Sequence, residues 1–175
     1  MVAGTAEARG LSAEAFRTLC NWAADASRPL PQHVRRRAAL ILADDVGAMI
    51  AASTEPQVMA AVDGFAASSS PAAEATVFAS GARKLDRYAA AAANGMAITW
   101  CELDEGFRLA PCHAGAYLLP ALLAEAERSD ASVSEVLSAI ARAYELTARL
   151  ALAFPFATMT VHPHAAFATI GAAAG

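Results

Sequence analysis

Residues 94–115 read NGMAITWCELDEGFRLAPCHAG and contain the densest group of charged residues in an otherwise apolar part of the chain. An alanine-rich apolar run ends here in three carboxylates within four positions, Glu102, Asp104 and Glu105. Burying a charge without a partner costs on the order of several kcal/mol. The acidic cluster therefore either faces water at the end of a helix or is held in place for chemistry.

The composition favours an all-α, multi-helix fold. A chain of 175 residues is expected to form one domain, residues 1–175. Apolar residues make up 57% of the chain and aromatic ones only 7%, with alanine the most frequent, and this favours closely packed helices over sheets. No apolar run is long enough to cross a membrane without charged interruptions, and residues 1–16 lack the pattern of a secretory signal. We therefore predict no membrane span.

Charge and cysteine usage argue against a nucleic-acid-binding protein and against a cysteine-bound metal site. The net charge is only −4, and the basic cluster Arg35–Arg37 lacks the interleaved aromatic residues of a nucleic-acid surface, so we expect it to be a solvated helix face. The three cysteines, Cys20, Cys101 and Cys112, have no metal-type spacing. Their odd number suits a reducing compartment, which predicts a cytoplasmic protein.

Periodicity and capping residues place the expected helices. Ser12, Asp86 and Ser132 are predicted N-caps, and Glu135 has the spacing of a capping box with Ser132. A short strand or extended connector is expected at residues 75–79. The expected helices cover residues 12–27, 32–52, 57–67, 87–101, 117–128, 133–154 and 165–175. Because the last of these runs to Gly175 without a cap, we expect the remainder of the fold to lie on another polypeptide or to be absent.

Two further groups of carboxylates leave alternatives open. Asp44 and Asp45 interrupt an apolar helix; we expect a structural carboxylate at a partly exposed site, the alternative being contact with a neighbouring helix end or an arginine. Glu102 and Glu105 share a face if the helix continues that far, whereas Asp104 points elsewhere. This cluster either orients a histidine or is a solvent-exposed helix end.

Histidines occur at two predicted helix entrances. His113 lies in a Pro-Cys-His-Ala-Gly turn and His162 in a Val-His-Pro-His turn. Free N–H groups at a helix entrance attract anions, and imidazole acts as acid or base near neutrality. For each histidine alone, a structural role is the alternative. A metal site using His113, His162 and His164 is disfavoured, because the spacing spans a proline and no established ligand pattern is present.

Several ordered blocks of sequence resemble the MmgE/PrpD family, which includes 2-methylcitrate dehydratase, cis-aconitate decarboxylase and iminodisuccinate epimerase. The blocks are ADDVGAMIAAS, ATVFASGARKLD, ANGMAITWCELDEG, CHAGAYLLPALLAEAE, SEVLSAIARAYELTARLA and VHPHAAFATIGAAAG. The resemblance implies the N-terminal part of a large helical domain, with no counterpart here of the family's smaller α/β lid. It also implies a metal-independent enzyme without a cofactor.

Residue by residue, Glu102, Asp104 and Glu105 match the family's acidic motif, and His113 and His162 match its two active-site histidines. The resemblance implies that these residues bind the substrate's carboxylates and relay protons. Ala114 replaces the usual proline after the first histidine, which makes that turn less rigid.

From this we expect a lyase-type enzyme portion that acts on a small di- or tricarboxylate, with dehydration of a 2-methylcitrate-like acid as the first choice. The alternatives are a decarboxylase or epimerase of the same family, and an inactive helical scaffold that forms a dimer. Small residues on the helices also favour a homodimer or association with the rest of the enzyme. The expected catalytic residues are His113, His162, Glu102 and Asp104, and the expected substrate-binding residues are Glu105, Arg108 and His164.

Overall fold

The computed structural model describes residues 6–156, 158 and 162–175, and over these residues the regular secondary structure is helical apart from one short hairpin. The α-helices are α1 (Ala6–Ala24), α2 (Gln32–Ala51), α3 (Pro56–Ser68), α4 (Arg87–Trp100), α5 (Ala114–Arg128), α6 (Val133–Ala153) and α7 (Pro163–Ala174). Strands β1 (Ala75–Val77) and β2 (Arg83–Leu85) pair antiparallel, and single 3-10 turns occupy Ala52–Thr54 and Phe78–Ser80. The all-α prediction is confirmed.

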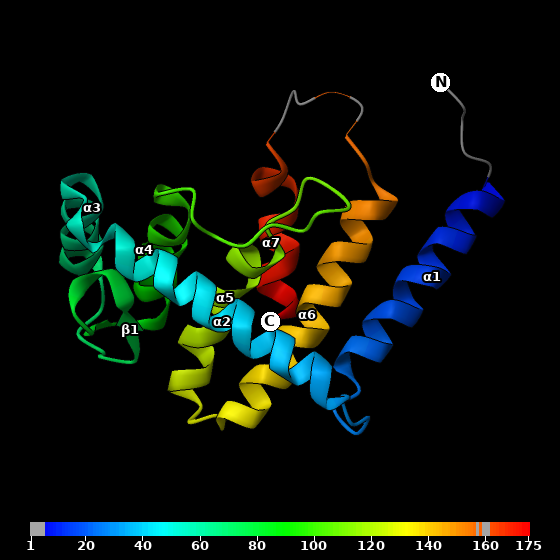
Figure 1. Ribbon diagram of the computed structural model, residues 1–175, viewed down its shortest axis with the longest axis horizontal. Coiled ribbons are helices and arrows are strands. Elements are labelled where there is room, and N and C mark those ends of the chain that lie inside the picture. Colours follow the sequence, from blue (N-terminus) through cyan, green and yellow to red (C-terminus); the bar gives the residue numbers. More distant parts are fainter. Residues whose placement is uncertain (1–5, 157, 159–161) are drawn as a thin grey trace.

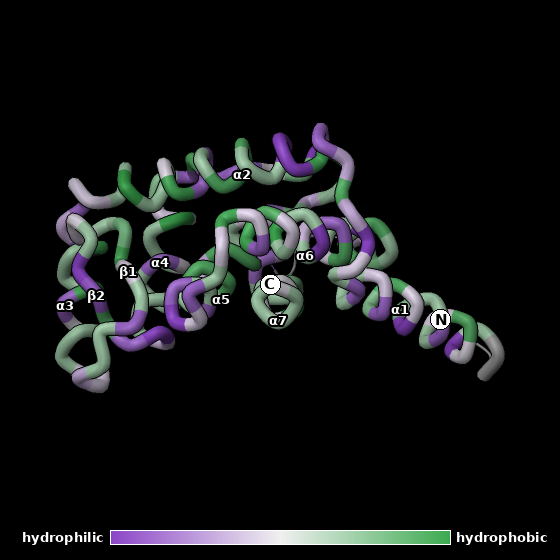
Figure 2. The backbone as a smooth tube through the Cα atoms, turned by 90° about the horizontal axis from the view of Figure 1, so that it is seen from below, coloured by the Kyte–Doolittle hydropathy of each residue, from purple (hydrophilic) through white to green (hydrophobic). Residues whose placement is uncertain are grey.

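Helix α5 lies at the centre of the fold. It is flanked by α4, α6 and α7, while α2 crosses over this group as a separate layer (Figures 1 and 2). Helix α1 leans away at one end and packs mainly against α6 (Figure 1). Among the described residues, no helix combines the length and apolar character needed to span a membrane.

Small side chains let these helices approach closely. Helix α4 has three fully buried alanines, Ala90, Ala93 and Ala97, and faces Pro120 of α5 at Gly95. Helix α7 lies against α5 at Gly171, where an added Cβ would stand 2.6 Å from the Cβ of Tyr117. Since real Cβ atoms do not approach so closely, the glycine is needed for this helix pair, and the alanine-rich composition is explained by the packing.

Two predicted N-caps are confirmed. The Asp86 carboxylate accepts hydrogen bonds from the N–H groups of Tyr88 and Ala89 and so begins α4. Ser132 and Glu135 form the expected capping box at the start of α6. Both signals are local, so the sequence was sufficient to find them.

Two predicted helix starts were wrong. The first helix already includes Ala6, and the Ser12 hydroxyl donates to a carbonyl within that helix instead of capping it. The predicted start at Tyr117 lies three residues inside α5, which begins at Ala114 and carries Pro120 in its interior. In both cases residues of good helix propensity, mostly alanine, extend the helix beyond the predicted boundary.

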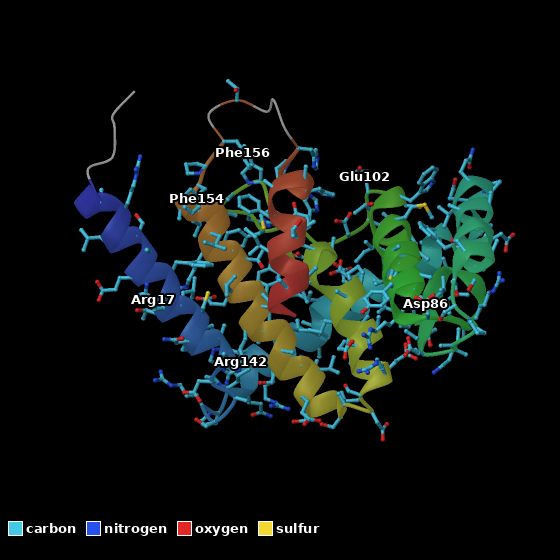
Figure 3. The ribbon with its side chains drawn as sticks, turned by 180° about the vertical axis from the view of Figure 1, so that it is seen from behind. Arg17, Asp86, Glu102, Arg142, Phe154 and Phe156 are labelled. Atoms are coloured by element: carbon cyan, nitrogen blue, oxygen red, sulfur yellow. The ribbon has the colours of Figure 1, made fainter. Side chains whose placement is uncertain are left out.

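Arg142 of α6 attaches α1 to the fold. Its side chain is almost fully buried, and its guanidinium donates to the backbone oxygens of Trp22 and Arg28, at 3.0 and 2.6 Å. Trp22 lies in the last turn of α1 and Arg28 in the connection that follows it. One buried cation therefore links two chain segments to α6 (Figure 3).

We expect Arg142→Met to lower the free energy of unfolding by about 2–3 kcal/mol, because two charge-assisted hydrogen bonds are lost while the aliphatic packing is kept. In the Arg142→Met variant the amides of α1 should exchange with deuterium faster than in the parent protein, and the change should be larger in α1 than in α5. The exposed residue Arg149, also on α6, provides the control: Arg149→Met should change stability by less than about 0.5 kcal/mol. Equal exchange rates in α1 before and after Arg142→Met would contradict the assignment.

Candidate active site

The loop between α4 and α5 carries the acidic cluster. Helix α4 ends at Trp100, and Glu102 adopts a left-handed backbone conformation with φ of 52°. Glu102 and Glu105 therefore lie in a loop and do not share a helix face. This loop passes beside the start of α7 (Figure 1) and is closed by a hydrogen bond of 2.8 Å from the Phe107 N–H to the Cys112 carbonyl.

Glu105 points into the protein and joins three elements. One carboxylate oxygen accepts a hydrogen bond of 2.7 Å from the N–H of Gly115 in the first turn of α5. The other accepts one of 2.7 Å from the hydroxyl of Tyr144 in α6. Burial raises the pKa of Glu105, and these two hydrogen bonds oppose that rise. Glu105 thus fixes the loop to the start of α5, where His113 is the N-cap residue.

Asp45 of α2 anchors the same loop from the other side. Its side chain is fully buried, which corrects the expectation of a partly exposed site, and one oxygen accepts a hydrogen bond of 2.9 Å from the Glu105 N–H. The other oxygen has no hydrogen-bond partner and lies against Gly115. Burial raises the pKa of Asp45 to about 7. The one feature of the sequence that indicates this role is weak: a carboxylate in an apolar helix.

The raised pKa of Asp45 predicts that the protein loses stability as the pH rises. The folded state holds a proton that the unfolded chain releases near its ordinary pKa of 3.8, so this stability is fully present below that pH and is lost as the pH rises to about 7. Asp45→Asn keeps the acceptor for the Glu105 N–H and cannot ionise. Part of this stability is already lost at pH 5, so we expect the advantage of the variant over the parent in free energy of unfolding to be roughly 2 kcal/mol larger at pH 8 than at pH 5. Urea denaturation at both pH values measures this, and an equal difference at both would contradict it.

His113 and Asp104 form a close pair at the surface of this network. The Nδ1 atom of His113 lies 2.9 Å from an Asp104 carboxylate oxygen, which is ion-pair distance, although the two atoms are not aligned for a hydrogen bond. The Asp104 side chain is only 2% exposed, whereas that of His113 is 31% exposed. A buried carboxylate thus faces one ring nitrogen of a partly exposed imidazole, the arrangement that orients a general acid or base.

The start of α7 brings two more imidazoles to His113. The ring centroid of His164 lies 5.2 Å from that of His113 and 4.2 Å from that of His162. The Nδ1 atom of His162 accepts a hydrogen bond of 3.3 Å from the His164 N–H and so caps α7. Burial and the two neighbouring imidazoles lower the pKa of His164. We call these three residues the histidine cluster.

The remaining predicted site residues, Glu102, Glu105 and Arg108, are not part of the histidine cluster. Glu102 is exposed beyond the end of α4 (Figure 3), close enough for its charge to raise the pKa of His164 against the stronger lowering effects. Arg108 is exposed and forms no hydrogen bond or ion pair with any described residue. The Glu105 carboxylate is occupied by its buried hydrogen bonds to Gly115 and Tyr144. The histidine cluster and Asp104 are thus brought together, while Arg108 is not seen to join them.

A cleft of about 260 Å³ lies beside the cluster, between α4, α5 and α7. His164, Tyr117 and Thr99 supply its polar side chains, and the rest of the lining is small and apolar. A larger groove of about 1510 Å³ between α1, α6 and α7 contains none of the predicted site residues and is lined mainly by apolar side chains such as Leu11, Phe16 and Phe154. Because a predicted site residue, His164, lines the smaller cleft and none lines the larger groove, the smaller cleft is the candidate substrate site.

A metal site was the competing interpretation of these side chains. Over residues 6–156, 158 and 162–175, no three histidine, cysteine, aspartate or glutamate side chains are arranged to hold a metal ion. The three cysteines are free thiols, and burial raises the pKa of Cys112 to about 12, so this thiol remains protonated.

Comparison with known protein families identifies the fold. A family model described as the MmgE/PrpD N-terminal domain matches residues 17–175, which include the acidic loop and the histidine cluster. The chain belongs to the MmgE/PrpD family. No match was found among curated proteins or among solved structures. The MmgE/PrpD domain of this chain therefore carries all seven predicted site residues within the matched region.

Proposed function

We propose that this MmgE/PrpD domain forms part of a lyase that dehydrates a 2-methylcitrate-like acid by general acid–base chemistry. One observation carries the proposal: residues about fifty positions apart, His113 and His162, are linked through the ring of His164 into one cluster, and Asp104 lies against the first of them. Acid–base groups of suitable pKa gathered beside a cleft are the usual sign of a catalytic site.

In this proposal His113 exchanges protons with the substrate. Dehydration removes a proton from the carbon next to a carboxylate and expels hydroxide from the neighbouring carbon, which needs protonation to leave as water. The Asp104 carboxylate faces Nδ1 of His113 and stabilises the imidazolium that forms when the ring takes up a proton. The Nε2 atom remains for the substrate.

His162 and His164 bind the acid's carboxylates in this proposal. They stand at the start of α7, where the positive end of the helix dipole favours an anion. The acidic residue Glu102 works against a polyanion unless the cluster is positively charged.

Turnover of 2-methylcitrate by the complete protein tests the proposal, with formation of the unsaturated acid followed by its ultraviolet absorbance. Decarboxylation of cis-aconitate and epimerisation of iminodisuccinate are the related reactions to assay beside it. Turnover of either one without turnover of 2-methylcitrate would replace the dehydratase by that activity and leave the acid–base roles in place. Failure with all three acids would reject the enzymatic proposal.

A non-catalytic helical module is the second candidate. It is favoured by the finding that, among the described residues, no lysine or arginine forms an ion pair with Asp104 or Glu105 or hydrogen-bonds the histidine cluster. A polyacid is normally held by such cations. Self-association without binding of citrate would support this candidate. The cytoplasmic location and the homodimer remain predictions, which fractionation and analytical ultracentrifugation can check.

A further inference from the structure

Tyr117 is a buried residue in contact with the histidine cluster, and it lies outside both the acidic motif and the histidine turns. Its side chain is 4% exposed, and its hydroxyl oxygen lies 3.2 Å from Nδ1 of His164. The two rings meet edge to face with centroids 5.1 Å apart. A buried tyrosine hydroxyl normally has a hydrogen-bond partner, and here that partner is an imidazole of the proposed site.

Tyr117 is also joined to the other side of the cluster. It follows His113 by one helical turn, and its N–H donates a hydrogen bond of 3.1 Å to the His113 carbonyl. Its Cβ packs against Gly171, two turns further along α7 than His164. One residue therefore sets both the spacing of α5 and α7 and the placement of His164 beside His113.

We propose that Tyr117 is a positioning residue of the acid-binding site: its hydroxyl donates to Nδ1 of His164, holds the proton of the neutral ring on Nε2, and so presents His164 to a substrate carboxylate as a hydrogen-bond donor. The tautomer assignment stands on the local contacts, whereas the role in binding rests on the proposed function.

The protonation states of both partners agree with this direction of the hydrogen bond. Burial raises the pKa of Tyr117 to about 12, so the hydroxyl keeps its proton. The pKa of His164 is lowered by burial first and then by His162 and His113, while Asp104 and Glu102 act in the opposite sense. A neutral ring has one acceptor nitrogen, and Nδ1 is the one within reach of the tyrosine hydroxyl.

The neighbouring ring shows the same arrangement. Nδ1 of His162 accepts from the His164 N–H, which leaves its Nε2 to carry the proton. Two adjacent imidazoles of α7 thus each have Nδ1 engaged by the protein and Nε2–H available to an anion. His113, which faces a carboxylate, differs from both. The cluster therefore separates anion binding by α7 from proton transfer by His113.

Tyr117→Phe removes only the hydroxyl and keeps the ring that packs on α7. With citrate as the probe, we expect the dissociation constant to rise about 3- to 10-fold, the size of one lost hydrogen bond. In the complete enzyme, KM should rise by a similar factor and kcat should change less. Tyr88→Phe, at a tyrosine that is 72% exposed on α4, is the matched control and should leave the affinity for citrate unchanged.

A double-mutant cycle separates positioning from general packing. If Tyr117 acts through His164, then Tyr117→Phe in a His164→Ala background should weaken citrate binding less than 2-fold. The same 3- to 10-fold loss in that background, or no loss in the parent protein, would overturn the proposed role in binding.

Nitrogen-15 spectra of the imidazole test the hydrogen bond without any ligand. In the parent protein the neutral His164 ring should be in the Nε2–H form, and Tyr117→Phe should admit some of the Nδ1–H form. A parent ring in the Nδ1–H form would overturn the inference. Failure of citrate to bind the parent protein would reject the proposed acid-binding function, and the role in binding with it, while the spectra would still decide the tautomer.

Discussion

Gly115→Ala is expected to lower the free energy of unfolding by about 2–4 kcal/mol, although Gly115 lies in a helix, where alanine is normally preferred. The added Cβ would overlap the buried Asp45 carboxylate and come within 3.0 Å of the Glu105 side chain. Asp45 has nowhere to retreat, because its other oxygen holds the Glu105 N–H. Relieving the overlap therefore breaks a buried hydrogen bond or moves the first turn of α5.

Chemical denaturation measures this loss, and Gly47→Ala is its matched control. Gly47 is an exposed glycine of α2, and nothing lies within 4 Å of the Cβ it would gain. This substitution should stabilise the protein by about 0.5–1 kcal/mol through helix propensity alone. Equal effects of the two substitutions would contradict the close contact between Gly115 of α5 and the Asp45 carboxylate of α2.

His113→Asn is expected to lower the turnover of the proposed reaction by a factor of about 10² to 10⁴. Asparagine places a polar amide group near the position of Nδ1, facing Asp104, and it is a favourable N-cap for α5. What it lacks is a group that exchanges a proton near neutral pH. The loss should therefore appear in kcat, with a smaller effect on the binding of citrate.

His33 offers the control for this prediction, because it is exposed on α2 and makes no contact with the histidine cluster. His33→Asn should leave turnover unchanged within about 2-fold. Unchanged turnover in His113→Asn would eliminate the acid–base role of His113, whatever the activity of the other variants.

Local signals in the sequence were sufficient for much of the fold. Asp86 and Ser132 cap helices because their side chains bond to backbone groups two or three residues away, so spacing alone reveals them. The same holds for His162, whose place before a proline predicted a helix entrance. The predictions failed at Ser12, since a serine inside an alanine-rich helix can turn its hydroxyl back to the preceding turn.

The parts that were missed depend on contacts between distant segments. Asp45 meets the acidic loop sixty residues later in the chain, and Tyr117 meets His164 forty-seven residues later. Gly115 and Gly171 are essential only because of what lies opposite them. No periodicity or capping rule contains this information, so the sequence could indicate candidate site residues but not the residues that hold them in place.

Binding of a small polyacid by the histidine cluster can be followed at all four histidine rings by NMR during a titration with citrate. We expect the ring signals of His113, His162 and His164 to shift together with a single dissociation constant, and the signal of His33 not to move. Shifts at all four rings alike, or at none of the three clustered rings, would contradict it.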